Sequence, residues 1–389
     1  MPGPLRGSRP TGRAGSALAD PPSRCRFSRP AIPEARGIIP LVSARPASKI
    51  ALIPGDGIGR DVTAEAVKVL RALGSVDLLE LPWSAEHYLH TGQTIPPDGY
   101  DTLRGFDAIL VGALGDPRVS DNRHARDILL GTRFELDLYV NHRPVRLLDD
   151  RLCPLKNRTR ADVNFVVFRE NTEGVYVGVG GRFKPGTDDE VAVQEEINTY
   201  KGVHRIIRHA FEFARARGLQ RVCMADKSNA MPQGHALWQR VFSAMKAEYP
   251  GIVATHLYID ALAMFLVQDP GQFQVIVTNN LFGDIITDIG GALQGGLGMA
   301  ASGNLHPGRT SMFEPVHGSA PPLAGKNVAN PIGAILSAAL MLESLGRDED
   351  ARRIEAAVEA AVHSREVTRD VGGVLGTREA GDAILRRLS

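Results

Sequence analysis

The sequence predicts an α/β protein with a mostly parallel central sheet, because short apolar runs alternate with glycine-rich turns and helical patterns. The first such unit is the apolar run at residues 49–53, a glycine turn at residues 54–59 and an amphipathic helix that ends at Gly74. Further apolar runs lie at residues 108–111, 164–167, 222–224 and 275–277. Ligands bind beyond the carboxyl ends of parallel strands, so residues that directly follow these runs are the candidate functional residues.

The glycine turn lacks the spacing of a dinucleotide-binding loop. Gly55, Gly57 and Gly59 are each two residues apart, whereas that fingerprint needs G-x-G-x-x-G and an acid after a second strand. We therefore interpret the turn alone as a tight structural turn and expect any cofactor site to be of a non-Rossmann kind.

Length and cysteine content limit the class of protein. A chain of 389 residues suggests about two domains. No apolar run reaches the roughly 20 residues that cross a bilayer. The three cysteines, Cys25, Cys153 and Cys223, are far apart and odd in number. They match neither a disulfide framework nor a metal motif, which predicts a reducing, cytoplasmic location.

Residues 1–48 differ in composition from the rest. They hold eight arginines, two acids and many Pro, Gly, Ala and Ser residues without a period, which gives a net charge of +6. Since the whole chain has +1, residues 49–389 carry −5, which argues against nucleic acid as the main partner. We predict a disordered extension. An organelle transit peptide and a translated upstream region are alternatives that fit the same composition.

Residues 171–200 interrupt the alternation of strands and helices. Valines such as Val175 and Val191 flank a polar, glycine-rich centre at residues 180–189. This pattern predicts a hairpin-like arm, which has too little core to stand alone. The same arm of a second subunit is a candidate partner for it.

Two aspartates four residues apart follow the apolar run at residues 275–277. Asp284 and Asp288 share one face of a helix. Inward-facing carboxylates repel each other unless a cation lies between them, and oxygen ligands suit Mg²⁺ or Mn²⁺. Asp260 follows another apolar run and is a third candidate ligand. For an isolated pair of aspartates, a solvated helix face is the alternative interpretation.

Positively charged side chains are candidates for binding an acidic substrate. Arg133, Arg143 and Arg169 carry planar guanidinium groups that bind carboxylates, and together they would suit a substrate with two carboxylates. Lys227 follows an apolar run and is a candidate base if nearby cations lower its pKa. Tyr176 is a candidate proton donor, with cross-strand packing as an equal alternative.

A polar loop at residues 313–331, rich in glycine and proline, leads into an apolar helix at residues 332–345. Such a loop at the mouth of an α/β sheet suits nucleotide binding through backbone groups and through His317 and Asn330.

Taken together, segments 279–288, 290–298 and 314–331 resemble the β-decarboxylating dehydrogenase family, which includes isocitrate, homoisocitrate, 3-isopropylmalate and tartrate dehydrogenases. The resemblance runs from about residue 49 to the C-terminus. It implies an isopropylmalate-dehydrogenase-like fold of two domains, with a β arm used for dimerisation.

The resemblance also implies domain boundaries and a partner. Residues 49–138 and 296–389 would form the cofactor-binding domain, and residues 139–295 the substrate, metal and dimerisation domain. Lys227 and Asp260 would reach into the site of the partner subunit, so a homodimer with shared active sites is expected.

Individual roles follow from the resemblance in the same way. The three arginines match residues that bind the substrate carboxylates, and Tyr176 and Lys227 match the catalytic pair. The matched metal ligands are Asp260, which also belongs to the substrate site, Asp284 and Asp288. The matched cofactor contacts are the glycine turn near Gly55 and Glu314, His317, Gly318, Ser319, Ala320 and Asn330.

The implied reaction is the metal-dependent oxidation and decarboxylation of a 2-hydroxy dicarboxylic acid. The metal lowers the pKa of the substrate hydroxyl, Lys227 accepts its proton, and a hydride passes to the nicotinamide. After CO₂ leaves, Tyr176 protonates the carbon.

Two features bear on which substrate is used. The pair Leu129-Leu130 resembles the apolar pair that packs a branched alkyl group in isopropylmalate enzymes, which favours 3-isopropylmalate, conversion to 4-methyl-2-oxopentanoate, and leucine biosynthesis. Residues 170–174 instead resemble the isocitrate, homoisocitrate and tartrate branches, so tartrate, D-malate and homoisocitrate remain alternatives. Arg126 stands where many isopropylmalate enzymes have a glutamate near the nicotinamide, unless a small gap places Asp127 there.

The cofactor is expected to be NAD. Pro322 replaces the aspartate that NAD-dependent members usually carry, but no cationic partner for the 2′-phosphate of NADP is evident. A catalytically silent regulatory subunit is the alternative of a different class, and the presence of every candidate catalytic residue argues against it.

Overall fold

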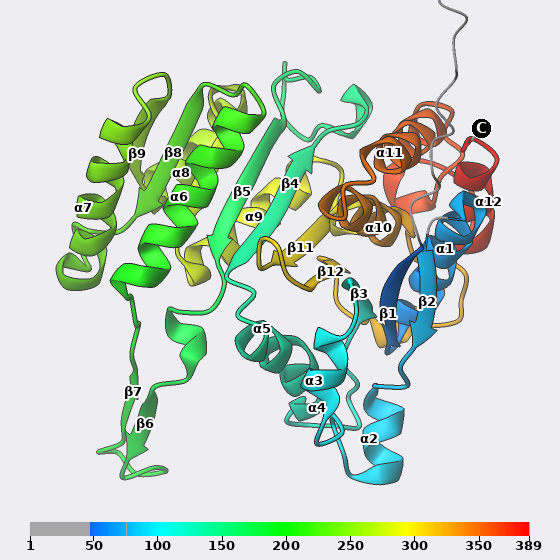
Figure 1. Cartoon of the computed structure of the whole chain (residues 1–389), viewed down its shortest axis with the longest axis horizontal. Coiled ribbons are helices and arrows are strands. Elements are labelled where there is room, and N and C mark those ends of the chain that lie inside the picture. The colour runs from blue at the N-terminus through cyan, green and yellow to red at the C-terminus, as the bar shows by residue number, and fades with distance from the viewer. Residues whose placement is uncertain (1–46, 75, 389) are drawn as a thin grey trace, which may run out of the picture. The chain divides into compact units, whose positions relative to one another are not determined.

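A ten-stranded sheet runs through the described residues, 47–74 and 76–388, of the computed structural model (Figure 1). From one edge to the other its strands are β2 (Val76–Glu80), β1 (Ser48–Gly55), β3 (Ala108–Ala113), β12 (Ser311–Pro315), β11 (Ala301–Leu305), β4 (Val140–Arg146), β5 (Asn164–Glu170), β10 (Val275–Thr278), β8 (Arg221–Asp226) and β9 (Val253–Tyr258). Neighbours are parallel except in the pairs β12–β11, β11–β4 and β4–β5. The predicted α/β fold with a mostly parallel sheet is confirmed.

Interior strands such as β3 and β10 read as continuous apolar runs because helices cover both faces of the sheet. Every residue of β3 and β10 is buried. Among the elements that carry candidate residues, α9 directly follows the buried strand β10, and α8 follows the edge strand β9. The sheet therefore brings residues from distant parts of the chain to the carboxyl ends of β5, β8 and β10.

The helices cover the sheet in two groups. Beside β1, β3 and β12 lie α1 (Ile58–Leu73), α10 (Ile332–Ser344), α11 (Asp348–His363) and α12 (Thr377–Leu385). Around β4, β5, β8 and β10 lie α6 (Tyr200–Ala216), α7 (Pro232–Glu248), α8 (Ile259–Gln268) and α9 (Asn280–Leu293). Buried apolar residues form separate clusters in the two groups, one around Leu70 and Phe313 and another around Phe168 and Trp238. The domain boundaries at residues 138 and 296 stay a prediction.

Shorter helices connect these elements. They are α2 (Ala85–Thr91), α3 (Gly99–Arg104), α4 (Arg123–Arg126), the π-helical turn η1 (Asp127–Gly131) and α5 (Thr132–Glu135). The last three follow one another without a break, so residues 123–135 form one helical stretch.

The predicted extension at residues 1–48 lies outside the described residues, apart from its last two. Ser48 begins β1, one residue before the expected start of the folded body. Among the residues described, no helix has the length and apolar character needed to span a membrane.

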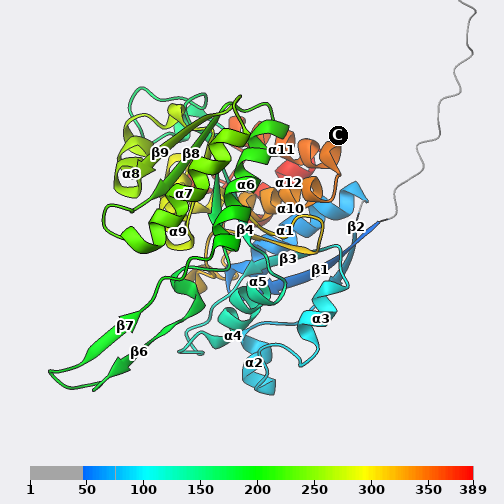
Figure 2. The same ribbon diagram turned by 60° about the vertical axis from the view of Figure 1, so that its left-hand side comes forward.

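The expected arm is present as an antiparallel ribbon of β6 (Gly180–Phe183) and β7 (Val191–Gln194), which projects from the rest of the fold (Figure 2). Its first strand begins later than expected, inside the stretch predicted as a polar centre. The reason is a short 3₁₀ helix, Val175–Val177, between Gly174 and Gly178, both at positive φ. Tyr176 lies in this helix, so its interpretation as a cross-strand packing residue is wrong.

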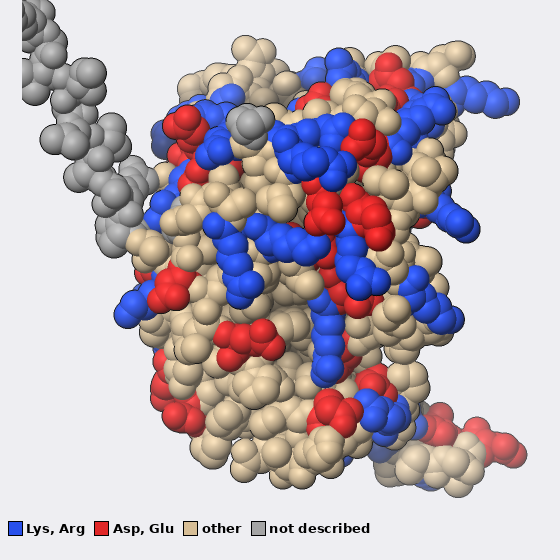
Figure 3. All heavy atoms as spheres, turned by 90° about the vertical axis from the view of Figure 1, so that its right-hand side faces the viewer, with Lys and Arg blue, Asp and Glu red and all other residues tan. Residues whose placement is uncertain are grey.

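Acidic and basic side chains lie next to each other on the face that carries α1 and α12 (Figure 3). Ion pairs connect its elements, such as Lys68 of α1 with Asp382 of α12 at 3.0 Å. Both signs of charge are therefore mixed locally on this face.

Candidate active site

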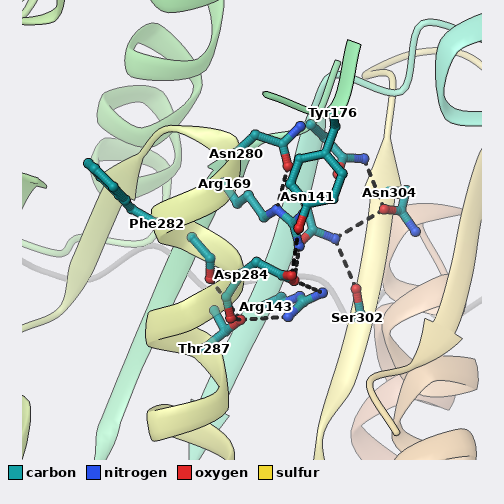
Figure 4. A network of polar contacts seen from close by, with 12 residues as sticks. Asn141, Arg143, Arg169, Tyr176, Asn280, Phe282, Asp284, Thr287, Ser302 and Asn304 are labelled. Carbon is teal, nitrogen blue, oxygen red and sulfur yellow. Dashed lines mark hydrogen bonds and ion pairs between the residues drawn. The ribbon is translucent and has the colours of Figure 1, made fainter. Parts of the chain in front are cut away.

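Two arginines and a carboxylate meet where the carboxyl end of β5 lies beside α9 (Figure 4). Arg169, the penultimate residue of β5, is 1% exposed, forms an ion pair with Asp284 and donates from Nε to Asn280 Oδ1 at 2.8 Å. Arg143 of β4 lies 3.4 Å from Asp284 Oδ1. Tyr176 donates its hydroxyl to Asp284 Oδ2 at 2.8 Å. Residues that are far apart in the sequence therefore form one polar network.

Positive charge dominates this network. Burial lowers the pKa of Arg169 to about 10, and the neighbouring Arg143 acts in the same direction. Burial alone would raise the pKa of Asp284, but the charges of Arg169 and Arg143 outweigh it and hold that pKa below its usual value. Burial also raises the pKa of Tyr176, so its hydroxyl keeps its proton at neutral pH. The excess of positive charge in this network favours the binding of a further anion.

A cavity of about 460 Å³ opens at this network. It is lined by Leu114, Asp121, Asn122, Ala125, Arg126, Leu129, Leu130, Arg133, Arg143, Arg169, Tyr176 and Asp284. The three predicted arginines, the tyrosine and the two leucines are therefore brought together. The leucines are half-buried on the helical stretch 123–135, so the cavity combines a cationic wall with an apolar one.

Arg126, and not Asp127, faces this cavity. Asp127 turns to another partner, since its Oδ2 accepts a hydrogen bond from Thr94 Oγ1 at 2.8 Å. The side chain of Arg126 is 63% exposed beside the opening. Asp127 therefore does not line the cavity.

Lys227 and Asp260 form a second group, separate from the first. The Nζ of Lys227 lies 2.6 Å from Asp260 Oδ1, and the side chain of Asp260 is 66% exposed. Neither residue lines the cavity, and no contact in the described part of the chain joins them to Tyr176 or Asp284. These two predicted site residues are therefore not brought to the others within one chain.

The predicted metal ligands are divided in the same way. Asp284 and Asp288 lie one turn apart on α9, with Asp288 exposed, whereas Asp260 belongs to the second group. Residues 47–74 and 76–388 contain no cluster of three or more His, Cys, Asp or Glu side chains that could hold a metal ion. The donor chemistry suits a hard divalent cation, but one chain supplies only two of the three carboxylates to one place.

The predicted cofactor segment adjoins the substrate cavity. His317 and Gly318 line a small cavity of about 160 Å³ that also reaches Arg133 and Arg143. The Nε2 of His317 is buried without a partner among the described residues, and burial lowers the pKa of the ring. Its neutral imidazole is available for a hydrogen bond with a ligand.

Other members of that segment have structural partners. Glu314 forms an ion pair with Arg133 at 2.9 Å, and the carbonyl of Ser319 accepts from the N–H of Ile58 at 2.8 Å. Asn330 accepts from the N–H of Ile332, at the start of α10, and donates to Asp370 at 2.9 Å. Ala320 takes a left-handed φ of 36° between these contacts. These bonds fix the shape of the loop.

Sequence reasoning missed the carboxylate inside the glycine turn. Asp56 is 4% exposed and accepts hydrogen bonds from the N–H groups of Ala85 and Gly115 and from His124 Nε2, at 2.8, 2.9 and 2.9 Å. Gly57 beside it has φ 54°, and a Cβ there would lie 2.1 Å from the carbonyl oxygen of Ser319. The signal in the sequence for this buried carboxylate was the position of Asp56 between two glycines.

A buried amide network supports Glu314 and was also missed. Asn304 accepts from the amides of Asn141 and Asn171 at 3.1 and 2.9 Å and donates to Glu314 at 2.9 Å. Figure 4 shows Asn141 and Asn304 beside the arginine network. The sequence held no local signal for these amides, because their partners come from different strands.

Fold and site together define a family. Residues 49–384 match the model of the isocitrate/isopropylmalate dehydrogenase family, and the chain belongs to it. The predicted resemblance and the predicted fold are thereby confirmed.

Similar proteins include a 3-isopropylmalate dehydrogenase of Rhodococcus erythropolis, 47% identical over 344 residues that span 87% of this chain and 100% of the relative. One of Corynebacterium jeikeium is 48% identical over 344 residues, spanning 87% and 99%. Among solved structures, an isocitrate dehydrogenase from Methylococcus capsulatus aligns with a TM-score of 0.80 and 36% identity, covering 88% of this chain and 99% of its own.

Proposed function

We propose that this protein is an NAD- and divalent-metal-dependent dehydrogenase that oxidises and decarboxylates 3-isopropylmalate to 4-methyl-2-oxopentanoate, a step of leucine biosynthesis. The observation that carries the proposal is the cavity in which Arg133, Arg143 and Arg169 face the apolar pair Leu129-Leu130. The relatives named 3-isopropylmalate dehydrogenase support the same substrate.

The three arginines bind the two carboxylates of the substrate. Arg143 and Arg169 are almost fully buried, so their attraction for an anion is weakly screened by water. Leu129 and Leu130 contact the branched alkyl group, and each buried methylene of that group contributes about 0.8 kcal/mol to binding. Arg126 at the opening is placed to meet a charged part of the cofactor or substrate.

Proton transfer falls to Tyr176 and Lys227. Lys227 accepts the proton of the substrate hydroxyl while the hydride from the same carbon passes to the nicotinamide. The neighbouring carbon then loses its own carboxylate as CO₂, the electron pair of that bond passes to the new ketone to give an enolate, and Tyr176 gives its proton to that neighbouring carbon. A divalent cation held by Asp284, Asp288 and Asp260 of the partner subunit would lower the pKa of the substrate hydroxyl and stabilise negative charge on that oxygen.

A homodimer completes the site. Lys227 and Asp260 face outward from a single chain, next to a surface with large exposed apolar side chains. Met264 and Val267 of α8 and Ile285 of α9 are 47%, 51% and 56% exposed. Such a patch beside a polar group is typical of a protein–protein interface. A second copy that covers it would bring its own Lys227 and Asp260 toward the cavity.

NAD is the proposed redox cofactor, bound along residues 314–320 with His317 and Gly318 nearest the substrate cavity. NADP is the alternative, because Arg60 and Arg378 line a cavity of about 280 Å³ beside Gly325 and Asn327; the acids Asp61 and Glu65 line the same cavity. Both cofactors are therefore compared in the test.

The test is steady-state reduction of NAD⁺ and NADP⁺ with Mn²⁺ or Mg²⁺ on a panel of 3-isopropylmalate, isocitrate, homoisocitrate, D-malate and tartrate. We expect kcat/KM for 3-isopropylmalate to exceed the others by about 10²-fold, as alkyl contacts allow. A preference for tartrate or D-malate would show that the leucine pair does not set specificity. No turnover on the whole panel would favour a silent regulatory subunit.

A further inference from the structure

A buried histidine contacts the backbone from which the catalytic lysine projects. His235 of α7 is 0% exposed, and its Nδ1 lies 2.7 Å from the backbone nitrogen of Lys227. A peptide N–H can only donate, so Nδ1 is the acceptor and the ring hydrogen lies on Nε2. Nε2 is 3.2 Å from Glu196 Oε2, to which it donates. The ring therefore bridges a peptide and a carboxylate in one defined orientation.

The carboxylate of Glu196 has a second partner. Its Oε1 accepts from Asn279 Nδ2 at 2.6 Å. Asn279 is the N-cap of α9, since its Oδ1 accepts from the N–H of Phe282 at 2.9 Å. Glu196 itself follows β7 on the return from the arm, and its side chain is only 9% exposed. The carboxylate of Glu196 thus contacts both His235, which accepts from the N–H of Lys227, and Asn279 at the start of α9.

Hydrogen bonds also hold Asp226, the residue before Lys227. Asp226 is 1% exposed and accepts from the N–H of Ser228 at 3.0 Å and from Gln239 Nε2 at 2.7 Å, with His256 Nε2 at 2.9 Å. Lys227 follows the end of β8 and lies outside the sheet. The hydrogen bond to His235 therefore holds the backbone of Lys227, as hydrogen bonds to neighbouring strands hold the backbone of β8.

We propose that the Glu196–His235 pair positions Lys227. Through Asn279 the same pair also positions α9, so that the place of Lys227 relative to Asp284 and Asp288 is fixed. The inference rests on the proposed function of Lys227 as the base. A lysine side chain has four rotatable bonds, so the direction of its backbone decides where the amine is held. Because Lys227 serves the partner's site and Asp284 its own, one buried carboxylate would align groups that belong to two active sites.

Two variants separate the two bonds of the ring. In His235→Asn the Oδ1 replaces Nδ1 as acceptor for Lys227, whereas in His235→Gln the Nε2 replaces the ring donor to Glu196. We expect His235→Gln to lower kcat by about 10²-fold, the cost of a small displacement of a catalytic group, with KM for 3-isopropylmalate nearly unchanged. His235→Asn should lower kcat by only about 5-fold, because the bond that orients the lysine remains while the bond to Glu196 is lost.

Amide hydrogen exchange supplies a readout that needs no turnover. The peptide spanning residues 226–231 should exchange about 10-fold faster in His235→Gln and near the original rate in His235→Asn, because exchange reports the loss of local hydrogen bonds. If His235→Gln does not fold, Glu196→Gln gives the same two readouts with a smaller expected change. Absence of turnover in the unaltered protein would overturn the proposed function, while the exchange data would still decide the positioning role.

Asn198→Ala is the matched control. Asn198 follows Glu196 on the same arm segment and accepts from Trp238 Nε1 of α7 at 2.8 Å. Its removal breaks a comparable bond between arm and helix without touching Lys227, and kcat should be unchanged. Equal kcat and equal exchange in His235→Asn and His235→Gln, or values that match Asn198→Ala, would overturn the inference.

Discussion

The arginine cavity and the Lys227–Asp260 pair differ in how complete they are within one chain. The cavity draws Arg143, Arg169 and Tyr176 from separate elements, and all three contact Asp284 inside the same chain. The second group consists of an exposed aspartate and a lysine that have only each other as ion-pair partners in the described chain. One region is an assembled binding site, whereas the other is half of a site presented outward.

The two regions therefore differ in how strongly the stability of the folded chain depends on their ion pairs. Burying an arginine costs several kcal/mol unless a carboxylate and further hydrogen bonds compensate it, so Arg169 depends on Asp284 and Asn280 even in the absence of substrate. An exposed ion pair such as Lys227–Asp260 contributes little to stability and can exchange its partner freely. The second region can therefore rearrange when another subunit approaches, and the first cannot.

Replacement of Arg169 by lysine should have the largest effect. Lysine keeps the charge but loses the planar pair of donors that binds a carboxylate, and its shorter contact would release Asn280. We expect kcat/KM for 3-isopropylmalate to fall by roughly 10³-fold, measured by steady-state NADH formation. Arg158→Lys is the control, because Arg158 pairs with Asp162 and Asp269 away from the cavity. A loss below tenfold in Arg169→Lys would mean that the buried arginine is structural only.

Mixing two inactive variants tests whether the second region serves another subunit. Tyr176→Phe and Lys227→Ala should each be nearly inactive. Half of the dimers in an equal, fully exchanged mixture combine one chain of each kind, and one of their two sites has both Tyr176 and Lys227. About a quarter of the original activity should therefore return, as the symmetry of a two-fold dimer requires. If both residues acted within one chain, the mixture would stay inactive.

The apolar wall can be tested separately from the arginines. Leu129→Ala removes part of the contact with the branched alkyl group while leaving the carboxylate contacts in place. We expect kcat/KM for 3-isopropylmalate to fall by about 10- to 200-fold, the range that small alkyl contacts discriminate. The same variant should leave kcat/KM for D-malate, which has no alkyl branch, almost unchanged. An equal loss on both substrates would show that Leu129 only supports the helical stretch 123–135.

The features of the two regions that could be predicted from the sequence are those determined by residues close together in the chain. Continuous apolar runs predicted the strands that are buried on both faces, such as β3 and β10. The spacing of Asp284 and Asp288 predicted a shared helix face, and the structure has both on α9. Each of these features is decided within about ten residues, so periodicity alone contains the information.

What could not be predicted depends on partners that are distant in the sequence. Asp56 is buried because it receives donors from residues 85, 115 and 124, which the turn itself does not reveal. The cofactor contact expected of Asn330 stays a prediction, and its bonds to the start of α10 and to Asp370 had no signal in the sequence. The separation of Lys227 from Tyr176 within one chain was implied only by the family resemblance, because the alternation of elements leaves the order of strands in the sheet undetermined.

The smallest expected effect concerns a buried group that, unlike Arg169, has no acidic partner among the described residues. His142 precedes Arg143 on β4, so its side chain points to the other face of the sheet, where it packs 5.1 Å from Phe168 and 5.5 Å from Phe213 between ring centroids. Burial, with smaller contributions from His209 and Arg217, lowers its pKa to about 3. The folded protein therefore keeps this ring neutral at pH values at which an unfolded chain protonates it.

The sign of the pH dependence follows from that shift. Between the ordinary histidine pKa near 6.5 and about 3, the unfolded chain binds a proton that the folded chain does not, so the free energy of unfolding falls as pH falls. His142→Gln should flatten this dependence by about 1 kcal/mol for each pH unit below 6, measured by urea unfolding at pH 4.5, 5.5, 6.5 and 8. His90→Gln, at a side chain that is 72% exposed, is the control and should not alter the slope. If the two variants give the same slope of unfolding free energy against pH, the buried His142 ring does not destabilise the folded protein in acid. The contrast with the arginines of the cavity, which have a carboxylate partner, would then not extend to stability.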